Sequence, residues 1–206
     1  MTPAVPLPLP ADRAAIRVHR DRDVSHEAPA ILAAGIIAHV AIADEHGPVV
    51  IPMTYQYDPA DPGHIHLHGG HHSRLLKALA SGGSISIGVT LADGLVYSKS
   101  ALNHSVNYRS AVVFGRADPA PVDLATQRRH LEAMIARYWP GRVPGNGYET
   151  IPERDLKATA FVTIAIEQVS AKRRTGGAKG PGDDDPAIPG TAGVSPIPDL
   201  APTATT

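Results

Sequence analysis

The sequence of 206 residues contains no cysteine, which excludes disulfide scaffolds, thiolate nucleophiles, zinc ribbons and iron–sulfur clusters. Aromatic residues are scarce, at 4% of the chain, with a single tryptophan. An excess of charge of one sign is also missing, because 19 lysines and arginines face 20 acidic residues and the formal net charge is -1. This balance argues against a surface built to bind nucleic acid or an anionic membrane.

Long hydrophobic runs are absent too. No apolar stretch reaches the roughly 18 residues that span a bilayer, and the longest candidate, Ile31 to Ala43, is interrupted by Gly35 and His39. The proline-rich start lacks the basic and apolar regions of a signal peptide. We therefore expect no membrane segment and a cytoplasmic location. The glycine-rich motifs of Rossmann and P-loop nucleotide sites are missing as well.

Glycine and proline are abundant, with 19 and 20 copies, and they divide the chain into three parts. Residues 1–12 carry four prolines and are expected to form a mobile N-terminal arm. Residues 179–206 form a low-complexity tail that is either disordered or pinned on a partner surface. The folded domain is then expected to span residues 13–178.

Within residues 13–178, runs rich in β-branched residues alternate with turn signals and a few capped helices. Ser25, Ser73 and Asp123 are expected to cap helices that end near Ala33, Ala80 and Trp139. His39 falls inside an apolar strand, so we expect a core histidine. Strands are expected over 36–43, 48–57, 64–68, 84–90, 95–102, 108–117 and 158–170. Six or seven strands joined mostly by hairpins, with helices inserted between them, indicate an antiparallel barrel of the α+β class.

Three histidines of one expected strand, His64, His66 and His68, share a face because side chains alternate along a strand. Imidazoles are good ligands for zinc, nickel or copper. Side chains two residues apart lie about 6.5–7 Å apart on a flat strand, which disfavours one ion shared by all three. A metal site and a row of solvent-facing histidines are therefore both open interpretations.

The turn from this strand into the next helix has the features of a phosphate site. Gly69 and Gly70 let the backbone approach a ligand closely. Ser73 lies at the helix start, Arg74 can fork onto a phosphate, and Lys77 follows one turn later. The alternative is an ordinary capped surface helix with solvated basic side chains, and spacing alone does not separate the two.

Three segments together carry a family resemblance: IPMTYQYD at 51–58, HGGHHSRLLKAL at 68–79 and HSVNYRSAVVFGRA at 104–117. In this order and spacing they resemble the flavin-nucleotide-binding branch of the pyridoxamine 5′-phosphate oxidase-like split β-barrel proteins, a branch that includes the nitroimidazole-resistance proteins. The likeness runs from about Ala30 to Gly177. Leu75 stands where the oxidases proper usually have a lysine, so the resemblance does not extend to oxidation of a vitamin B6 phosphate.

The resemblance implies a homodimer that binds FMN in two clefts between the subunits. One group of matching residues would contact the flavin ring or its phosphate, namely Pro52, Met53, Thr54, Leu67, His68, Ser73, Arg74 and Lys77. A second group would complete the cleft, namely Asn107, Tyr108, Arg109 and Ser110. The closing segment of the family resembles residues 172–177, where Arg173, Arg174 and Thr175 are either solvated or reach a cofactor phosphate or substrate across the dimer.

The function that follows from this resemblance is an FMN-dependent oxidoreductase that passes hydride or electrons to a small electron-poor substrate, such as a nitroaromatic or a quinone. The flavin itself carries that chemistry, so no acid–base pair is required of the protein. His104 is the one candidate catalytic side chain, with a plain loop residue as the alternative. A non-catalytic flavin-binding or flavin-sensing protein and a haem- or metal-binding barrel remain competing functions.

Overall fold

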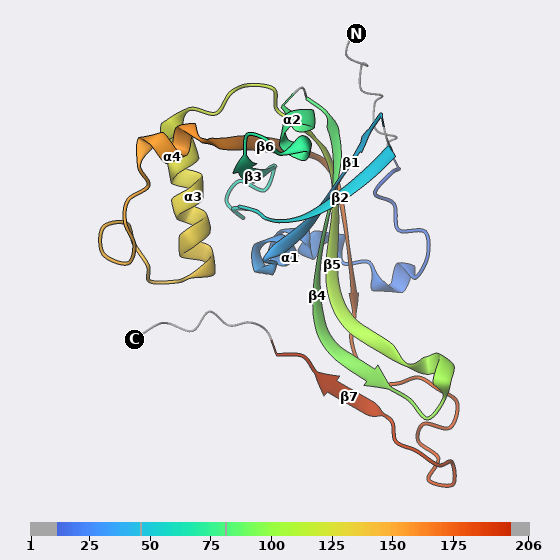
Figure 1. Ribbon diagram of the computed structural model, residues 1–206. Helices are drawn as coiled ribbons and strands as arrows, with labels where there is room; N and C mark the ends of the chain where they lie inside the picture. Colours follow the sequence, from blue (N-terminus) through green and yellow to red (C-terminus); the bar gives the residue numbers. More distant parts are fainter. Residues whose placement is uncertain (1–11, 46, 81, 199–206) are drawn as a thin grey trace.

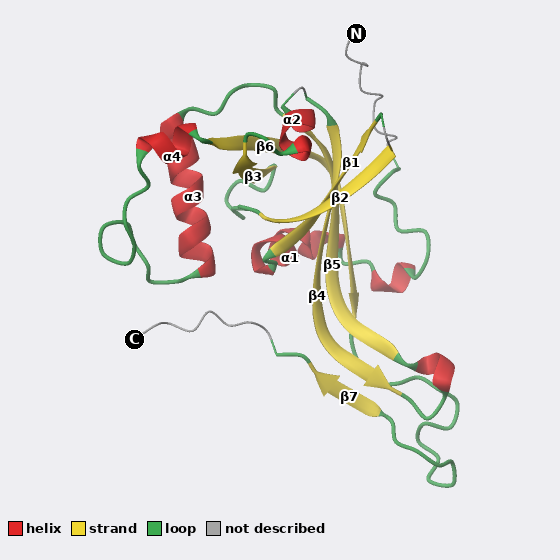
Figure 2. Ribbon diagram, in the orientation of Figure 1, coloured by secondary structure: helices red, strands yellow, loops and turns green. Residues whose placement is uncertain are grey.

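The computed structural model describes residues 12–45, 47–80 and 82–198 (Figure 1). The expected N-terminal arm, apart from Asp12, and His46 in the first expected turn lie outside these residues. Seven strands pair antiparallel in one curled sheet, with short helices between them (Figure 2). This architecture confirms the predicted α+β split barrel. The strands are β1 Ile37–Asp44, β2 Gly47–Thr54, β3 His64–Gly70, β4 Ser84–Tyr97, β5 Ser105–Ala117, β6 Thr159–Arg174 and β7 Gly193–Pro196.

The strands follow the order β2-β1-β4-β5-β6-β3, and β7 pairs separately with β4. The two ends of this row meet through a backbone bridge between Gln56 and His66, whose N–H groups each donate to the other residue's carbonyl oxygen at 2.9 Å. The sheet therefore closes on itself at one end. The end of β4 and the start of β5 project from the barrel as a long arm, distinct from the N-terminal residues, and β7 pairs with β4 in this arm (Figure 1).

Four α-helices cover the barrel: α1 Ala28–Ala34, α2 Arg74–Leu79, α3 Leu124–Tyr138 and α4 Glu153–Lys157. Two of the expected caps are confirmed, because Ser73 Oγ accepts from Leu76 N at 3.3 Å and Asp123 Oδ1 accepts from Thr126 N at 2.9 Å. The α2 helix buries one leucine face in the core. The largest fully buried side chains are Tyr55, Tyr57, Ile31, Leu32, Ile65, Leu67, Leu75, Leu76, Leu79, Ile87, Leu156 and Ile164. No described helix has the length and apolar character to cross a membrane.

The expected break between two strands at residues 92–94 is wrong. The chain runs through it as the single strand β4, and the register against β5 shifts between Ala92 and Gly94. Asp93 is the extra residue of this β-bulge, and its carboxylate accepts hydrogen bonds from Arg109 on β5. Turn-forming residues therefore produce a bulge here, because a side-chain partner on the neighbouring strand holds the extra residue in place.

Two smaller expectations also differ from the structure, and one helix was not expected. Ser25 does not cap α1, since its hydroxyl donates to Asp23 Oδ1 at 2.6 Å and a short 3-10 helix, η2 Ser25–Glu27, precedes α1. Helix α4 had no clear signal in the sequence. His39 is exposed, because it alternates with the buried Ala38 and Val40 on the outer face of β1.

Part of the expected low-complexity tail is ordered against the arm. Its strand β7 pairs with residues 94–97 of β4. Ahead of β7, Asp183 accepts hydrogen bonds from the Ser98 hydroxyl at 2.8 Å, Lys99 N at 2.8 Å and Gly180 N at 2.6 Å. Burial raises the pKa of the Asp183 carboxyl, but these hydrogen bonds outweigh it, so that the pKa lies below the usual value. The tail thus continues the sheet of its own chain.

Candidate flavin site

The predicted phosphate turn lies between β3 and α2. Gly69 sits so close to the helix that an added Cβ would lie 3.0 Å from Leu76 Cδ1. The Ser73 hydroxyl caps helix α2 by accepting from Leu76 N, and the side chains of Arg74 and Lys77 are exposed beside it. Arg74 forms an ion pair with Asp44 at the end of β1, with Nε and Oδ2 3.4 Å apart. The turn therefore presents two cations at the protein surface, one of them already paired.

The residues expected beside the flavin ring lie on β2, which ends the strand row. Pro52 and Thr54 face outward, while Met53 is half-buried and packs against the core. Met53 also lies near the phosphate turn, since its Cε would be 4.0 Å from a Cβ on Gly69. The strand and the turn are thus neighbours in the fold, as the resemblance implies.

Leu67 and His68 precede the turn on β3, with different exposure. Leu67 is fully buried in the core, so only its backbone can contact a ligand. His68 is partly buried, and burial lowers the pKa of its imidazole. The side chain is therefore neutral near pH 7.

The second group of predicted residues lies at the start of β5, near the arm. Asn107 is only 8% exposed; its Nδ2 donates to Gly176 O at 3.0 Å and its Oδ1 accepts from Arg174. Arg109 Nη2 donates to Asp93 Oδ1 at 2.6 Å and its Nε donates to the same carboxylate at 3.0 Å. Tyr108 and Ser110 are half-buried.

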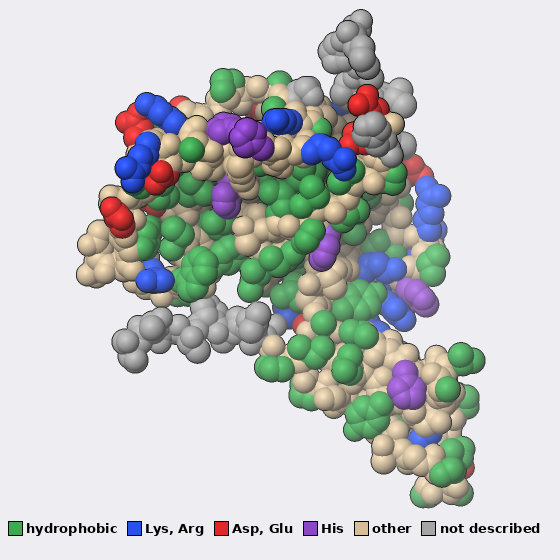
Figure 3. Space-filling view, in the orientation of Figure 1, with side chains coloured by type: hydrophobic (Ala, Val, Ile, Leu, Met, Phe, Trp, Pro, Cys, Tyr) green, Lys and Arg blue, Asp and Glu red, His purple; other side chains and the backbone are tan. Residues whose placement is uncertain are grey.

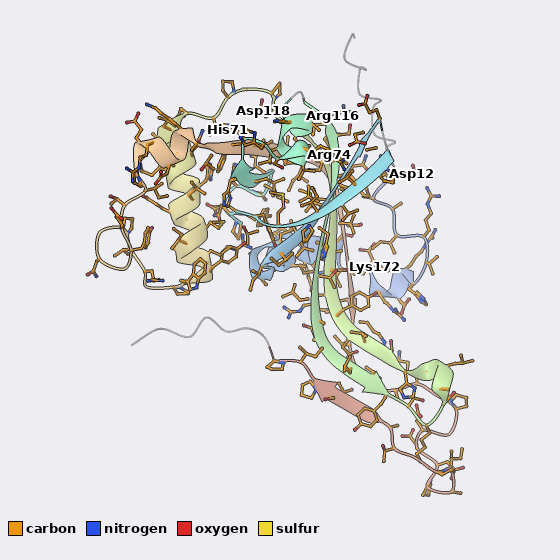
Figure 4. The ribbon with its side chains drawn as sticks, viewed as in Figure 1. Asp12, His71, Arg74, Arg116, Asp118 and Lys172 are labelled. Carbon is orange, nitrogen blue, oxygen red and sulfur yellow. The ribbon has the colours of Figure 1, made fainter. Side chains whose placement is uncertain are left out.

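The phosphate turn and the second group lie at opposite ends of β6. Gly69 pairs with Ala160, whereas Ser110 pairs with Lys172, twelve residues further along β6. That interval corresponds to roughly 40 Å of strand length, although β6 curls. Figure 4 shows the same separation, with His71 and Arg74 at the α2 end and Lys172 toward the arm. One chain thus separates the phosphate turn from the second group along β6. The residues of β2, by contrast, are in register with the second group across the sheet, since Met53 pairs with Ala38, and Ala38 is linked through the pairing of Val89 to Ala111.

His104 lies outside both groups. Its side chain is exposed, and Nδ1 lies 3.2 Å from Ala101 O. It lines a cleft of about 550 Å³ together with residues from the N-terminal segment and the end of β6. This location makes His104 part of a separate cleft at the base of the arm.

Among the residues that the structure describes, no group of three or more His, Asp or Glu side chains is placed to hold a metal ion, and this applies to the three histidines of β3 as well. His64 Nδ1 lies 2.9 Å from Asp61 Oδ1. His66 is buried, and its ring centroid lies 3.6 Å from that of His130 on α3. Burial, with a further contribution from His130, lowers the pKa of His66 to about 4. This neutral pair ties β3 to α3.

Comparison with protein families matches residues 25–173 to the family described as pyridoxamine 5′-phosphate oxidase. The chain belongs to this family. The match covers the barrel, both groups of predicted residues and most of β6. The family resemblance expected from the sequence is therefore confirmed.

Solved structures of similar fold include a flavocytochrome from Azotobacter vinelandii, with 30% identity over 93% of this chain and 87% of that chain and a TM-score of 0.78. A FAD and heme binding protein from Mycobacterium smegmatis has 28% identity over 89% of this chain and 91% of that chain, with a TM-score of 0.73. A putative 5-nitroimidazole antibiotic resistance protein from Bacteroides thetaiotaomicron shares the fold, with 20% identity over 71% of this chain and 82% of that chain and a TM-score of 0.57. The comparison with curated proteins gives no match.

This member of the pyridoxamine 5′-phosphate oxidase family also has a polar clamp next to β2 that the sequence did not predict. The guanidinium of Arg137 on α3 lies over the Tyr55 ring, 4.6 Å from its centroid, and donates to Gly35 O. Tyr138 OH donates to Tyr55 O at 2.7 Å. The amphipathic pattern of α3 predicted packing here, but the hydrogen bonds to Tyr55, which follows β2 and lies 82 residues before Arg137, had no local signal.

Proposed function

We propose that this chain is a flavin-binding protein that holds the phosphate of FMN at the turn between β3 and α2. The observation that carries the proposal is the combination at this turn of a close-packed Gly69 with the exposed cations Arg74 and Lys77. A guanidinium forks onto phosphate oxygens, and an ammonium adds a point charge. Membership of the family and the names of two similar structures, a flavocytochrome and a FAD and heme binding protein, support a flavin as the cofactor.

The ion pair between Arg74 and Asp44 fits this role. The Arg74 side chain is 59% exposed and the contact is 3.4 Å, so the pair is weak and a dianionic phosphate can replace it. Without a ligand the carboxylate keeps the guanidinium near the turn. Binding then exchanges one anionic partner for another at little cost in free energy.

The edge strand β2 is suited to the polar rim of the flavin ring. Among the residues that the structure describes, β2 pairs only with β1. Alternate N–H and C=O groups on its outer edge therefore face away from the sheet and can bond to the ring. Met53 supplies an apolar contact between this edge and the turn. The bound flavin would supply hydride and electron transfer to a small electron-poor acceptor.

The proposed site combines two copies of the chain. The turn of one copy and the Asn107–Ser110 segment of the other would meet, since they lie far apart along β6 within one copy. The arm also carries exposed apolar side chains that a second copy can cover, with Leu95 53% and Leu102 96% exposed. We therefore propose a homodimer with one flavin at each of two equivalent sites.

Flavin binding is tested by titrating the purified protein with FMN and following absorbance near 450 nm and quenching of flavin fluorescence. Arg74→Ala should weaken FMN binding at least about tenfold, since a charged hydrogen bond contributes about 1.5–3 kcal/mol in a well-formed site. Arg154→Ala is the matched control, because Arg154 is 85% exposed and lies on α4. Equal affinity of Arg74→Ala and wild type would refute the phosphate assignment. A sedimentation measurement that finds only monomers with FMN bound would refute the two-chain site.

Catalysis is a separate step of the proposal. Reduction of the bound flavin by a nicotinamide dinucleotide, followed by reoxidation with a nitroaromatic or a quinone, would support an oxidoreductase. Tight FMN binding without reoxidation by any acceptor in such a panel would favour a flavin carrier or sensor.

A second candidate function is binding of haem together with a flavin. The names of the two relatives at 30% and 28% identity state a flavocytochrome and a FAD and heme binding protein. Imidazole is a common ligand of haem iron, and His71 and His72 project from the turn with exposed side chains. Haem titration that gives a Soret band in wild type and a weakened one in His72→Ala would support this function.

A further inference from the structure

The cleft at the base of the arm lies outside the proposed flavin turn. It has a volume of about 550 Å³ and is built from three parts of the chain: the segment around the 3-10 helix η1 Arg20–Arg22, the residues just before β5, and the end of β6 with the loop that follows. Figure 3 shows basic and histidine side chains gathered beside the place where the arm leaves the barrel. The size suits a ligand larger than a single phosphate.

The lining of this cleft is strongly cationic. Arg22, Arg173, Arg174 and Lys179 line it, against one acidic residue, Asp21. This is unusual in a chain whose total charge is -1. Four cations around one cavity repel one another, and an anion in the cavity removes that repulsion.

Two of these cations are held in place by the protein. Arg173 Nη1 lies 2.8 Å from Glu27 Oε2. Arg174 donates to the side-chain oxygen of Asn107 and, through Nη2, to Gly177 O at 3.2 Å. Both guanidinium groups are thus positioned at the end of β6 before any ligand arrives, which lowers the entropy cost of binding.

The other two cations lack such a partner. Among residues 12–45, 47–80 and 82–198, neither Arg22 nor Lys179 has a carboxylate within ion-pair distance. Arg22 is half-buried. Arg174 is held by uncharged oxygens, so that three of the four cations keep their full charge in the cavity. Such a cavity suits an anion with more than one negative group.

The backbone of the cleft has one further unusual feature. His19 lines the cavity with φ 56° and ψ 55°, and it is the one non-glycine residue with positive φ among those described. A left-handed backbone conformation at a residue other than glycine costs free energy, which the surrounding structure must offset. Together with His104, it places imidazole hydrogen-bonding groups beside the cations.

We propose that this cleft binds the diphosphate of a nucleotide. Several phosphate oxygens can be shared between forked guanidinium groups and Lys179, and the remaining volume accommodates a nucleoside. The choice of a nucleotide rests on the proposed function, because a nicotinamide dinucleotide that reduces a flavin carries a diphosphate. The source that fits is therefore a separate dinucleotide that donates electrons, since the diphosphate of a dinucleotide flavin includes the phosphate already assigned to the turn between β3 and α2. Asn107 joins the cleft to the second group of predicted flavin residues.

The test uses the full chain and isothermal titration calorimetry with ADP, first on protein without flavin and then on protein saturated with FMN. Arg22→Gln combined with Lys179→Gln should weaken ADP binding at least tenfold, and added salt should weaken wild-type binding. Arg20→Gln is the matched control, because Arg20 lies on the same 3-10 helix but does not line the cleft. NADPH and FAD are then titrated in the same way.

Each outcome decides the proposal. If the double variant weakens NADPH binding on FMN-saturated protein, the source is a separate electron donor. If it weakens binding of FAD but not of FMN or NADPH, the cleft belongs to a dinucleotide flavin and the proposal of a separate donor is overturned. ADP binding weaker than about 1 mM in wild type, or equal losses in Arg20→Gln and the double variant, would overturn the cleft proposal. Failure to bind any flavin while ADP binding depends on Arg22 and Lys179 would instead overturn the proposed function and leave the anion site in place.

Discussion

Replacement of His66 by glutamine should remove much of the acid sensitivity of the fold. His66 is 6% exposed, its ring lies 3.6 Å from that of His130, and its Nδ1 lies 3.2 Å from Thr163 Oγ1. Burial and the neighbouring His130, with smaller effects of His64 and Arg129, lower its pKa from 6.5 to about 4, while Asp61 acts in the opposite direction. His66 therefore binds a proton less readily in the folded protein than in the unfolded chain.

The sign and size follow from that difference. Above pH 6.5 the side chain is neutral in both states, so it adds no pH dependence. As the pH falls below 6.5, the unfolded chain binds more protons and stability decreases, until the slope ends near the folded pKa. His66 alone should lower the free energy of unfolding by ~2 kcal/mol between pH 7 and pH 5, and by ~3 kcal/mol between pH 7 and pH 4.

The assay is urea unfolding at fixed protein concentration at pH 7, 6 and 5, followed by circular dichroism. His66→Gln should unfold with a smaller difference between pH 7 and pH 5 than wild type, by about 2 kcal/mol. His64→Gln is the control, because its side chain is 43% exposed and lies on the same strand. An unchanged pH slope in His66→Gln would refute the reasoning, since it would show that His66 accepts a proton in the folded state without penalty.

Three further changes test other contacts. Gly35→Ala should destabilise the fold by ~1–3 kcal/mol, because the new Cβ would lie 2.3 Å from Val89 Cγ1 and 2.7 Å from the Tyr55 hydroxyl, while Gly88→Ala, with open space around it, should leave the melting temperature nearly unchanged. Asp44→Asn should tighten FMN binding by about 1.5- to 5-fold, since an exposed ion pair contributes about 0.2–1 kcal/mol, and weaker binding in this variant would contradict the placement of the phosphate beside Arg74. Asp183→Ala should speed tryptic cleavage after Lys179, because it removes two hydrogen bonds that join the tail to the arm and one that orders the tail at Gly180; Asp184→Ala serves as its control, and equal cleavage rates would show that Asp183 does not hold the tail.

Local signals predicted the elements whose cause is local. The strand at residues 64–68, the cap at Ser73 and the cap at Asp123 all follow from alternation or from one side chain, and the structure has each of them. The bulge at Asp93 could not be predicted in this way, because it depends on Arg109 from another strand. Likewise, β7 consists of four residues in a proline-rich tail and exists because β4 offers an edge.

The candidate site shows the same division. The glycine and basic residues at 69–77 are contiguous in sequence, so their turn could be read directly. The cationic cleft gathers Arg22, Arg173 and Lys179 from both ends of the chain, and no spacing rule links them. The sequence also gave no sign that the phosphate turn and the Asn107–Ser110 segment would lie at opposite ends of β6, since that depends on how the strands pair.

The attachment of the tail to the arm affects how this protein tolerates damage. A two-stranded ribbon is marginal in water, yet the projecting part of β4 and β5 gains β7 as a third strand, with Gly193 packed against the Tyr97 hydroxyl. A single proteolytic cut between residues 185 and 193 would allow β7 to dissociate and would expose the edge of β4 next to Leu95. Such clipped molecules would be expected to stick to one another edge to edge, so that a loss of solubility during storage would trace back to a few residues far from the barrel.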